Sequence, residues 1–185
     1  EDGITKGDLV DYYRQVAPAI LSYLKQRPLN MQRFPNGINA QGFYQKQMPD
    51  YFPEWMDRVS VEVLGEGQRQ AQVVCNDAAT LVYLANQACV TPHAWLSRVD
   101  RLDHPDKLIF DFDPSADDFE SVRSAALAMR VLIDDLGLTP FVMTTGSRGL
   151  HIVIPLDRSL PFDDTRAFAR HLAETLTRRD PDHWT

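Results

Sequence analysis

Apolar residues near the start of the chain recur at the spacing of an amphipathic helix. They are Leu9, Tyr13, Val16, Ile20 and Leu24. Thr5, followed three residues later by Asp8, resembles a capping box with Asp in place of the usual Glu. We therefore predict a helix that begins near Thr5. Pro18 should kink or divide it, because proline lacks the amide hydrogen that the helix needs.

The next segments alternate between irregular and regular patterns. Residues 27–57 are rich in proline and aromatic residues, which predicts an irregular lobe. Residues 59–63 alternate valine with polar side chains, as on a half-buried strand. A Gly-Glu-Gly turn at 65–67 and a second strand around 71–75 follow, so we predict a β-hairpin. A helix is then predicted over 77–88.

The second half of the chain shows the clearest pattern. An apolar strand at 108–110 runs into Asp111-Phe112-Asp113-Pro114. A long amphipathic helix is predicted to begin at Asp118 and to end at Gly137. Its predicted core residues are Val122, Ala125, Ala126, Met129, Leu132, Ile133 and Leu136.

Two more strands and a helix complete the pattern. A strand over 141–145 meets a glycine turn at 146–149, and a further strand, 150–154, leaves that turn. The last helix is predicted over 162–178, with Asp163 and Asp164 where the N-cap is expected. The mixture of strands and helices predicts an α/β or α+β fold.

Composition limits the class of protein. The chain has 185 residues, 44% hydrophobic and 24% charged, which suits one globular domain. No apolar run approaches the roughly 20 residues that span a bilayer. Because the chain begins with Glu1 instead of Met, we expect it to be a segment of something longer. Cys75 and Cys89 are too few for a zinc site and are expected to be buried thiols of a cytosolic protein.

The net charge of −7 argues mildly against nucleic-acid binding, because such proteins are usually basic where they contact the phosphates. The local distribution of charge matters more than the total. Many acidic residues lie between Asp100 and Asp135. The first fifty residues have a basic bias that comes from Lys6, Lys25, Arg27, Arg33 and Lys46.

Asp111 and Asp113 are candidate metal ligands. Side chains at i and i+2 of a strand point to the same face, so the two carboxylates should converge. Their hard oxygen ligands suit Mg²⁺ or Mn²⁺, and two such ions can clamp the oxygens of a phosphoryl transfer. The alternative is that this short pattern only ends a strand and begins a turn.

The turn at 145–151 is the second candidate site. Its two glycines allow backbone amides to approach an anion closely, and Arg148 adds a planar group suited to phosphate. His151, on the strand that leaves the turn, is placed to donate a hydrogen bond to a phosphate oxygen. The alternative is a β-hairpin turn with an incidental arginine and a half-buried histidine.

Two further patterns are weaker by themselves. His93 lies near Trp95, where a histidine is more often a packed core residue than a ligand. Phe43 and Tyr44 precede Lys46, an arrangement that suits base stacking with a phosphate contact. Ordinary core aromatics beside a surface lysine are the alternative.

The order of these motifs along the chain carries more information than any one of them. The motifs are RFPNG at 33–37, FYQK at 43–46, HAW at 93–95, LIFDFDP at 108–114 and TGSRGLH at 145–151. Together they resemble the polymerase domain of bacterial ligase D, in the archaeo-eukaryotic primase superfamily. The resemblance extends from Thr5-Lys6 to Pro181-Asp182. It implies a two-lobed domain of the primase type, with a central, mostly antiparallel sheet flanked by helices. Residues 1–57 would form the DNA-contacting part and 58–185 the catalytic part.

The resemblance also implies roles for the residues of the catalytic part. Asp111 and Asp113 match the carboxylates that hold the catalytic metals. Thr145, Arg148 and His151 match the motif that contacts the incoming triphosphate, and Ser147 lies in the same turn. The family commonly has Ser in place of Thr145 and often Lys in place of Arg148, and both changes here keep the functional group.

Other roles implied by the resemblance concern the remaining motifs. His93 matches a histidine near the bound nucleotide. Phe43 and Tyr44 match aromatic residues near the template, and Lys6 matches a lysine that helps to bind the 5′-phosphate at a DNA break. Lys46 is assigned to the same DNA-binding surface.

One departure from the family pattern lies at the end of the chain. The family's third motif carries another metal-binding Asp on strands beyond the last helix, and the sequence ends at Asp182-His183-Trp184-Thr185 without it. We therefore expect this chain alone to be a poor or inactive polymerase.

The resemblance implies a template-directed nucleotidyltransferase that adds NTP or dNTP units to a DNA 3′ end during end joining, with Mn²⁺ or Mg²⁺. Ligase and nuclease modules and a Ku-type protein would be its partners, in the cytoplasm and near the nucleoid. The alternatives are a non-catalytic nucleotide- or DNA-end-binding module and a metal-dependent phosphoesterase. The phosphoesterase is disfavoured, because no further His/Asp cluster accompanies the Asp pair.

Overall fold

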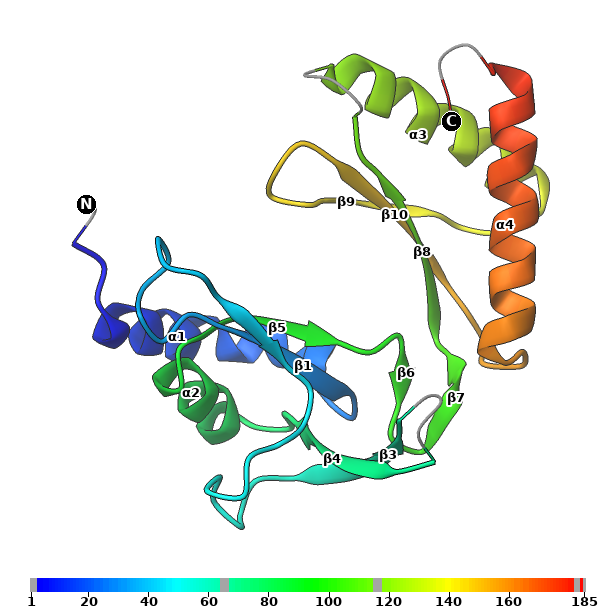
Figure 1. Cartoon of the computed structure of the whole chain (residues 1–185). Coiled ribbons are helices and arrows are strands. Elements are labelled where there is room, and N and C mark those ends of the chain that lie inside the picture. Colours follow the sequence, from blue (N-terminus) through cyan, green and yellow to red (C-terminus); the bar gives the residue numbers. More distant parts are fainter. Residues whose placement is uncertain (1–2, 64–66, 115–117, 182–183, 185) are drawn as a thin grey trace. The chain divides into compact units, whose positions relative to one another are not determined.

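The computed structural model describes residues 3–63, 67–114, 118–181 and 184. The chain forms two compact units, Glu1–Asp100 and Arg101–Thr185 (Figure 1). The division lies further along the chain than the change near residue 57 that the sequence suggested. The reason is that strands on both sides of residue 57 belong to one sheet.

The first unit begins with helix α1 (Lys6–Leu24). The predicted capping box is present: the Thr5 hydroxyl accepts a hydrogen bond from the Asp8 amide at 3.2 Å, and the Asp8 carboxylate accepts one from the Thr5 amide at 2.7 Å. Pro18 lies inside the helix without dividing it. The helix is anchored by Tyr13, whose hydroxyl donates to the Val90 carbonyl at 2.7 Å.

An antiparallel sheet forms the rest of this unit, together with helix α2 (Ala78–Asn86). Its strands are β1 (Pro28–Arg33), β2 (Phe43–Gln45), β3 (Arg58–Glu62), β4 (Arg69–Val74) and β5 (Cys89–Ala94). The strand order is β2-β1-β4-β3, and β5 also pairs with β1. A short strand, β6 (Ser97–Arg98), comes near the end of the unit.

The prediction of an irregular lobe over 27–57 was wrong for two segments, because β1 and β2 lie within it. Pro28 is the first residue of β1, where a strand tolerates the missing amide hydrogen. The predicted hairpin is confirmed by the antiparallel pairing of β3 with β4. Its Gly65-Glu66 turn lies outside the described residues.

The core of the first unit lies between its sheet and its two helices. Leu29 and Met31 of β1 are fully buried and pack with Leu81 and Leu84 of α2. The two cysteines, Cys75 and Cys89, are free and buried in this core, as predicted.

The second unit contains a three-stranded antiparallel sheet of order β8-β10-β9. Its elements are β7 (Arg101–Pro105), β8 (Lys107–Phe112), α3 (Phe119–Asp135), β9 (Phe141–Thr144), β10 (Leu150–Pro155) and α4 (Phe162–Arg179). Each predicted strand and helix of this region is present. The mixed α/β fold with antiparallel sheets is therefore confirmed, although the strands form separate sheets instead of one central sheet.

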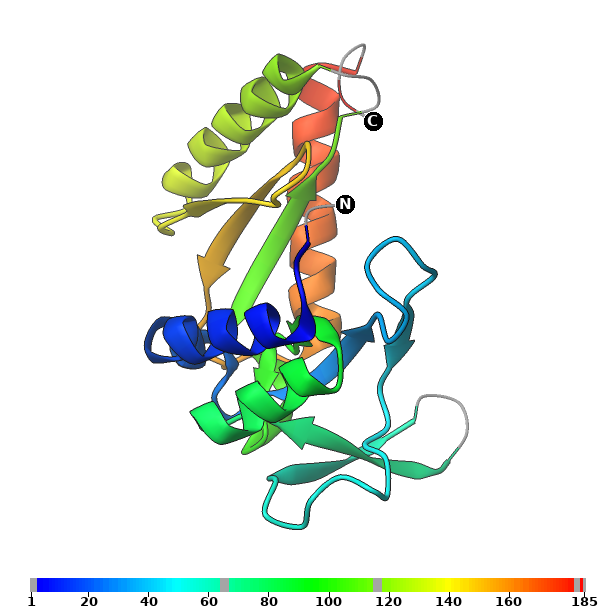
Figure 2. The ribbon, with the colours of Figure 1, turned by 90° about the vertical axis from the view of Figure 1, so that its left-hand side faces the viewer.

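The two faces of the β8-β10-β9 sheet differ. Leu150, Ile152 and Ile154 of β10 are buried against α3 and α4, which lie beside the strands in both ribbon views (Figures 1 and 2). Because side chains alternate along a strand, His151 and Val153 point to the opposite face. That face is not covered by the two helices.

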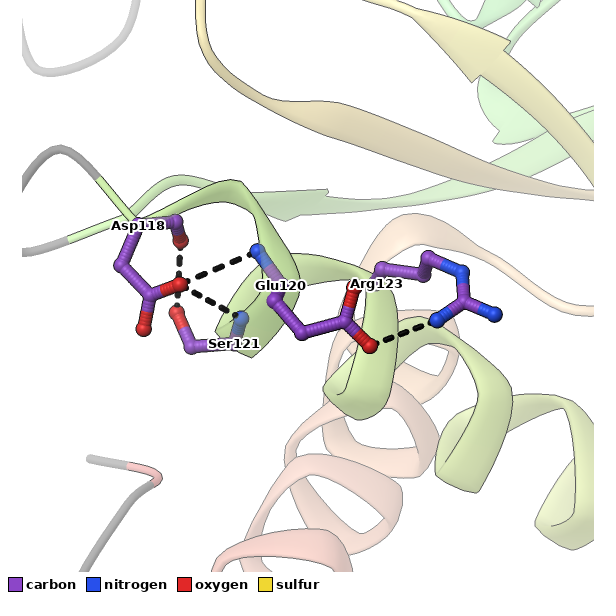
Figure 3. Close-up of polar contacts among 4 residues, drawn as sticks. All are labelled: Asp118, Glu120, Ser121 and Arg123. Atoms are coloured by element: carbon purple, nitrogen blue, oxygen red, sulfur yellow. Dashed lines mark hydrogen bonds and ion pairs between the residues drawn. The ribbon is translucent and has the colours of Figure 1, made fainter.

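The ends of the helices follow local rules. The predicted start of α3 is confirmed, with Asp118 as its N-cap: the Asp118 carboxylate accepts hydrogen bonds from the amides of Glu120 and Ser121 at 3.1 and 3.3 Å (Figure 3). Gly137, with φ of +72°, follows the end of the helix. The predicted N-cap of α4 was wrong, because Pro161 is the N-cap of this helix. Asp163 and Asp164 lie in its first turn instead, where the helix dipole favours acidic side chains.

Candidate active site

Asp111 and His151 face each other across two paired strands. They are direct partners in the β8–β10 register, and His151 Nε2 lies 3.1 Å from Asp111 Oδ1. The Asp111 side chain is 58% exposed and that of His151 is 25% exposed. The sheet therefore joins the predicted metal ligand of one motif to the predicted phosphate contact of the other.

Asp113 contacts the glycine turn at a second point. A Cβ atom placed on Gly149 would lie 2.5 Å from both the Asp113 Oδ1 atom and the Phe112 carbonyl oxygen. Only a residue without a side chain permits this approach. From the sequence we assigned the glycines of this turn to anion binding. The structure shows that Gly149 also fits against the second carboxylate.

Thr145 holds the turn together through its hydroxyl. Its Oγ1 donates to the Gly149 carbonyl at 3.2 Å and accepts from the amides of Gly149 and Ser147 at 3.2 and 3.4 Å. Gly146 adopts φ of +81°, a conformation that favours glycine. These contacts leave Ser147 and Arg148 exposed at the tip of the turn.

A pocket lies beside the two aspartates. Its volume is about 240 Å³, and Asp111 and Asp113 line it together with Ser121 of α3 and Thr177 of α4. Apolar side chains, among them Met129 and Trp184, line the remainder. The pocket thus has both polar and apolar lining residues.

The carboxylates of Asp111 and Asp113 could supply part of the ligands of a divalent cation. Carboxylate oxygens are the protein ligands that Mg²⁺ and Mn²⁺ prefer, and both Asp side chains are exposed at the same end of β8. Among the described residues, no group of three or more His, Cys, Asp and Glu side chains is placed to hold a metal ion. Water and the phosphate oxygens of a nucleotide would have to complete the coordination shell.

The remaining predicted residues lie in the first unit. His93 of β5 is exposed, so the alternative of a packed core histidine was wrong. Its ring contacts that of Tyr44 at a centroid distance of 5.3 Å, and its Nε2 lies 3.4 Å from Gln32 Oε1. The predicted nucleotide contact and the predicted template contact are therefore neighbours on this sheet. The side chains of Phe43, Tyr44 and Lys46 are all exposed.

Lys6 is the first residue of α1 and is exposed. It lines an apolar pocket of about 480 Å³ together with Leu9, Phe34 and Ile38. The carboxylate of Asp8, two residues away, carries a negative charge that reduces the positive potential there, and hydrogen bonds from Thr5 hold its pKa below the ordinary value. An anion at this site would depend on the charge of Lys6.

Comparison with known proteins adds to this geometry. A family model described as "LigD, primase-polymerase domain" matches residues 5–185. The chain belongs to the LigD primase-polymerase domain family. The resemblance inferred from the sequence motifs is thereby confirmed.

Several curated LigD proteins are similar to this chain. The bifunctional non-homologous end joining protein LigD of Bacillus subtilis is 31% identical over 183 residues, which cover 98% of this chain and 29% of that protein. The multifunctional non-homologous end joining DNA repair protein LigD of Mycobacterium tuberculosis H37Rv is 31% identical, over 97% of this chain and 24% of that protein. The chain thus spans less than a third of the length of these relatives.

A solved structure supports the assignment of the fold. The polymerase domain from Mycobacterium tuberculosis ligase D, determined in complex with DNA, matches with a TM-score of 0.87 and 29% identity. The match covers 96% of this chain and 64% of the solved one. In the described part of this LigD-family chain, no helix combines the length and apolar character needed to cross a membrane.

Proposed function

We propose that this chain carries the nucleotidyl-transfer site of a template-directed polymerase that acts at DNA double-strand breaks. It would transfer nucleotides from NTP or dNTP to a DNA 3′ end in non-homologous end joining. The observation that carries the proposal is the meeting of Asp111, Asp113 and the 145–151 turn at one end of the β8–β10 pair, in a member of the LigD polymerase family.

Asp111 and Asp113 would hold the divalent cation, Mn²⁺ or Mg²⁺. Such an ion, when bound, neutralises charge on the triphosphate and the leaving pyrophosphate. Asp111 also orients the imidazole of His151, because the carboxylate lies 3.1 Å from Nε2. Arg148 is exposed on the turn and offers its guanidinium to a phosphate oxygen.

The first unit would contact the DNA and the incoming nucleotide. Phe43 and Tyr44 expose aromatic rings that suit base stacking, and Lys46 follows them with a cation. Tyr44 contacts His93, which by family resemblance would contact the bound nucleotide. Lys6 would bind the 5′-phosphate of the break. By the family resemblance, ligase and nuclease modules and a Ku-type protein would be partners.

A second candidate is a nucleotide- or DNA-end-binding module without catalysis. It is favoured by one observation: the described residues bring together two candidate ligands and no third. A site with two carboxylates binds a nucleotide–metal complex more readily than it fixes two ions for catalysis.

Primer extension on a recessed DNA end, with NTP or dNTP and either cation, tests the proposal in a version of the chain extended through the family's third motif, because we expect the chain alone to be a poor or inactive polymerase. We expect Asp113→Asn to abolish extension and to leave DNA affinity unchanged, because it removes a metal ligand without changing the DNA surface. Asp135→Asn is the matched control, since it removes the same charge at the last residue of α3. Calorimetric titration with Mn²⁺ gives a second readout, in which Asp113→Asn should weaken binding.

The outcomes separate the two candidates. Extension that survives Asp113→Asn would overturn the assigned chemistry. Metal-dependent nucleotide binding that is lost in Asp113→Asn, without extension by the version that carries the third motif, would favour the binding module.

A further inference from the structure

The Arg33 side chain of the first unit makes four hydrogen bonds. Its Nε donates to the Gln87 carbonyl at 2.8 Å, and its Nη2 donates to Gln87 Oε1 at 3.2 Å. Its Nη1 donates to Gln45 Oε1 at 2.6 Å and to the Tyr51 hydroxyl at 3.1 Å. One guanidinium therefore links the end of β1 to β2, to the 51–52 region and to the C-cap of α2.

The same guanidinium lies over the ring of Phe43. The distance from Arg33 Cζ to the ring centroid is 5.7 Å, within the range of a cation–π contact. The two residues are also direct partners in the β1–β2 register. Phe43 remains 45% exposed, so one part of the ring is held by Arg33 and another part is open to solvent.

The strand that carries Phe43 needs such support. β2 has three residues and is at the end of the strand order β2-β1-β4-β3, where it pairs with β1. A short edge strand has few backbone hydrogen bonds to fix it. The hydrogen bond from Arg33 to Gln45 and the contact with Phe43 hold the two ends of β2 from a single side chain.

The hydrogen bonds also argue against a direct contact between this arginine and a DNA phosphate. A guanidinium has five N–H donors in a fixed planar fork, and four hydrogen bonds already engage this one. Arg33 contributes to the basic bias of the first fifty residues, but four of its five donors are directed to groups of the protein and not toward a phosphate.

We propose that Arg33 is a positioning residue, which holds Phe43 in the orientation that stacks on a DNA base. The proposal rests on the proposed function, in which Phe43 contacts DNA. Arg33 acts through Phe43 and does not itself contact the DNA. Without Arg33, the Phe43 ring and strand β2 are no longer held in one orientation. They then have to become ordered each time DNA binds, which weakens the binding.

A double-mutant cycle tests this role in the full chain. The probe is a recessed DNA end with 2-aminopurine as the first unpaired template base, because its fluorescence falls when it stacks on an aromatic ring. We expect Phe43→Ala to weaken DNA binding roughly tenfold, as for the loss of one stacked base. Arg33→Ala should produce a similar loss together with weaker quenching, and the double variant should be no weaker than Phe43→Ala alone.

Two controls separate positioning from charge and from general stability. Arg33→Lys keeps the charge but not the planar fork, so it should not restore quenching. Arg69→Ala is the matched control: its guanidinium also makes two hydrogen bonds in this unit, to Ser60 Oγ and to the Ser60 carbonyl. The DNA affinity of the Arg69→Ala variant should stay within about twofold of that of the unaltered chain.

Additive losses in the double variant would overturn the positioning role while leaving the DNA contact of Phe43 intact. If Phe43→Ala itself leaves affinity and quenching unchanged, the DNA contact of Phe43 is overturned, and the positioning role with it. If Arg33→Ala does not fold, Gln45→Ala decides the question, because it removes one of the four acceptors. If Gln45→Ala weakens DNA binding in the unaltered chain but not in the Phe43→Ala variant, the proposal is supported. If Gln45→Ala leaves the DNA affinity of the unaltered chain unchanged, the proposal is overturned.

Discussion

The His151 imidazole lies 3.1 Å from the Asp111 carboxylate, directly opposite it on the neighbouring strand. The carboxylate accepts a hydrogen bond from Nε2 when that nitrogen carries the proton, and this fixes the orientation of the ring. The side chain that is proposed to bind metal therefore also orients the side chain that is proposed to meet the triphosphate. Mutations of the two residues should consequently not act independently.

His151→Ala should weaken nucleotide binding by about 2 kcal/mol, the range for a hydrogen bond to a charged group. Calorimetric titration of the chain with a nucleoside triphosphate and Mn²⁺ measures the change. His171→Ala, at an exposed position of α4 in the same unit, is the matched control and should bind as the unaltered chain does. Equal losses in both variants would refute a specific role for His151.

Gly149→Ala should damage the metal site although both aspartates remain. The new Cβ would lie 2.5 Å from Asp113 Oδ1 and from the Phe112 carbonyl oxygen, and a backbone atom cannot move away as a flexible side chain does. We expect weaker Mn²⁺ binding and a lower melting temperature.

Gly137→Ala is the control: the φ of +72° at this position strains the backbone of an alanine, but a Cβ there meets nothing within 4 Å. It should lose about 1 kcal/mol of stability and retain its affinity for Mn²⁺. Unchanged Mn²⁺ affinity in Gly149→Ala would show that this contact does not place Asp113.

Removal of the 5′-phosphate from a recessed DNA end should weaken binding by the chain, and Lys6→Ala should cancel that difference. The reason is that Lys6 supplies a positive charge at the start of α1, where the ionised carboxylate of Asp8 repels a phosphate. Lys25→Ala, at the C-cap of the same helix, should keep the preference for the phosphorylated end. Titrations at several salt concentrations should show weaker binding at higher salt, because phosphate contacts release counterions. Equal affinity of the unaltered chain for both ends would argue against a phosphate site at Lys6.

The two cysteines predict how stability changes in alkaline solution. Burial in the core of the first unit raises the pKa of both Cys75 and Cys89 to about 12, from an ordinary value of 9.0. The folded chain therefore binds these protons more tightly than the unfolded chain. The resulting stability is fully present below pH 9 and is lost as the pH rises through the interval between 9 and 12.

Urea unfolding at a series of pH values measures this loss, and the Cys75→Ala variant should show a shallower decline above pH 9 than the unaltered chain. An identical decline in the variant would mean that other groups cause it. In the folded chain near neutral pH, both thiols should react slowly with thiol reagents, because the reactive thiolate is scarce.

Local patterns in the sequence determined the helices, most of the strands and the identity of the candidate site residues. The Thr5–Asp8 capping box, the Asp118 cap and the strand–turn–strand at 141–155 involve residues that are close along the chain. Hydrogen bonding and side-chain periodicity over such short distances are visible without a fold. Family resemblance then assigned roles to residues such as Asp111 and His151, and these roles remain predictions.

Only the tertiary structure decided which of these residues touch. The pairing of β1 with β4 and β5 joins segments that are far apart in sequence, so the strand nature of residues 28–33 was hidden behind the prolines and aromatics around them. The same holds for Gly149 against Asp113, for Tyr44 against His93 and for Arg33 across β2 and α2. These contacts depend on strand register and on the packing of whole elements, and no local spacing of residues encodes that.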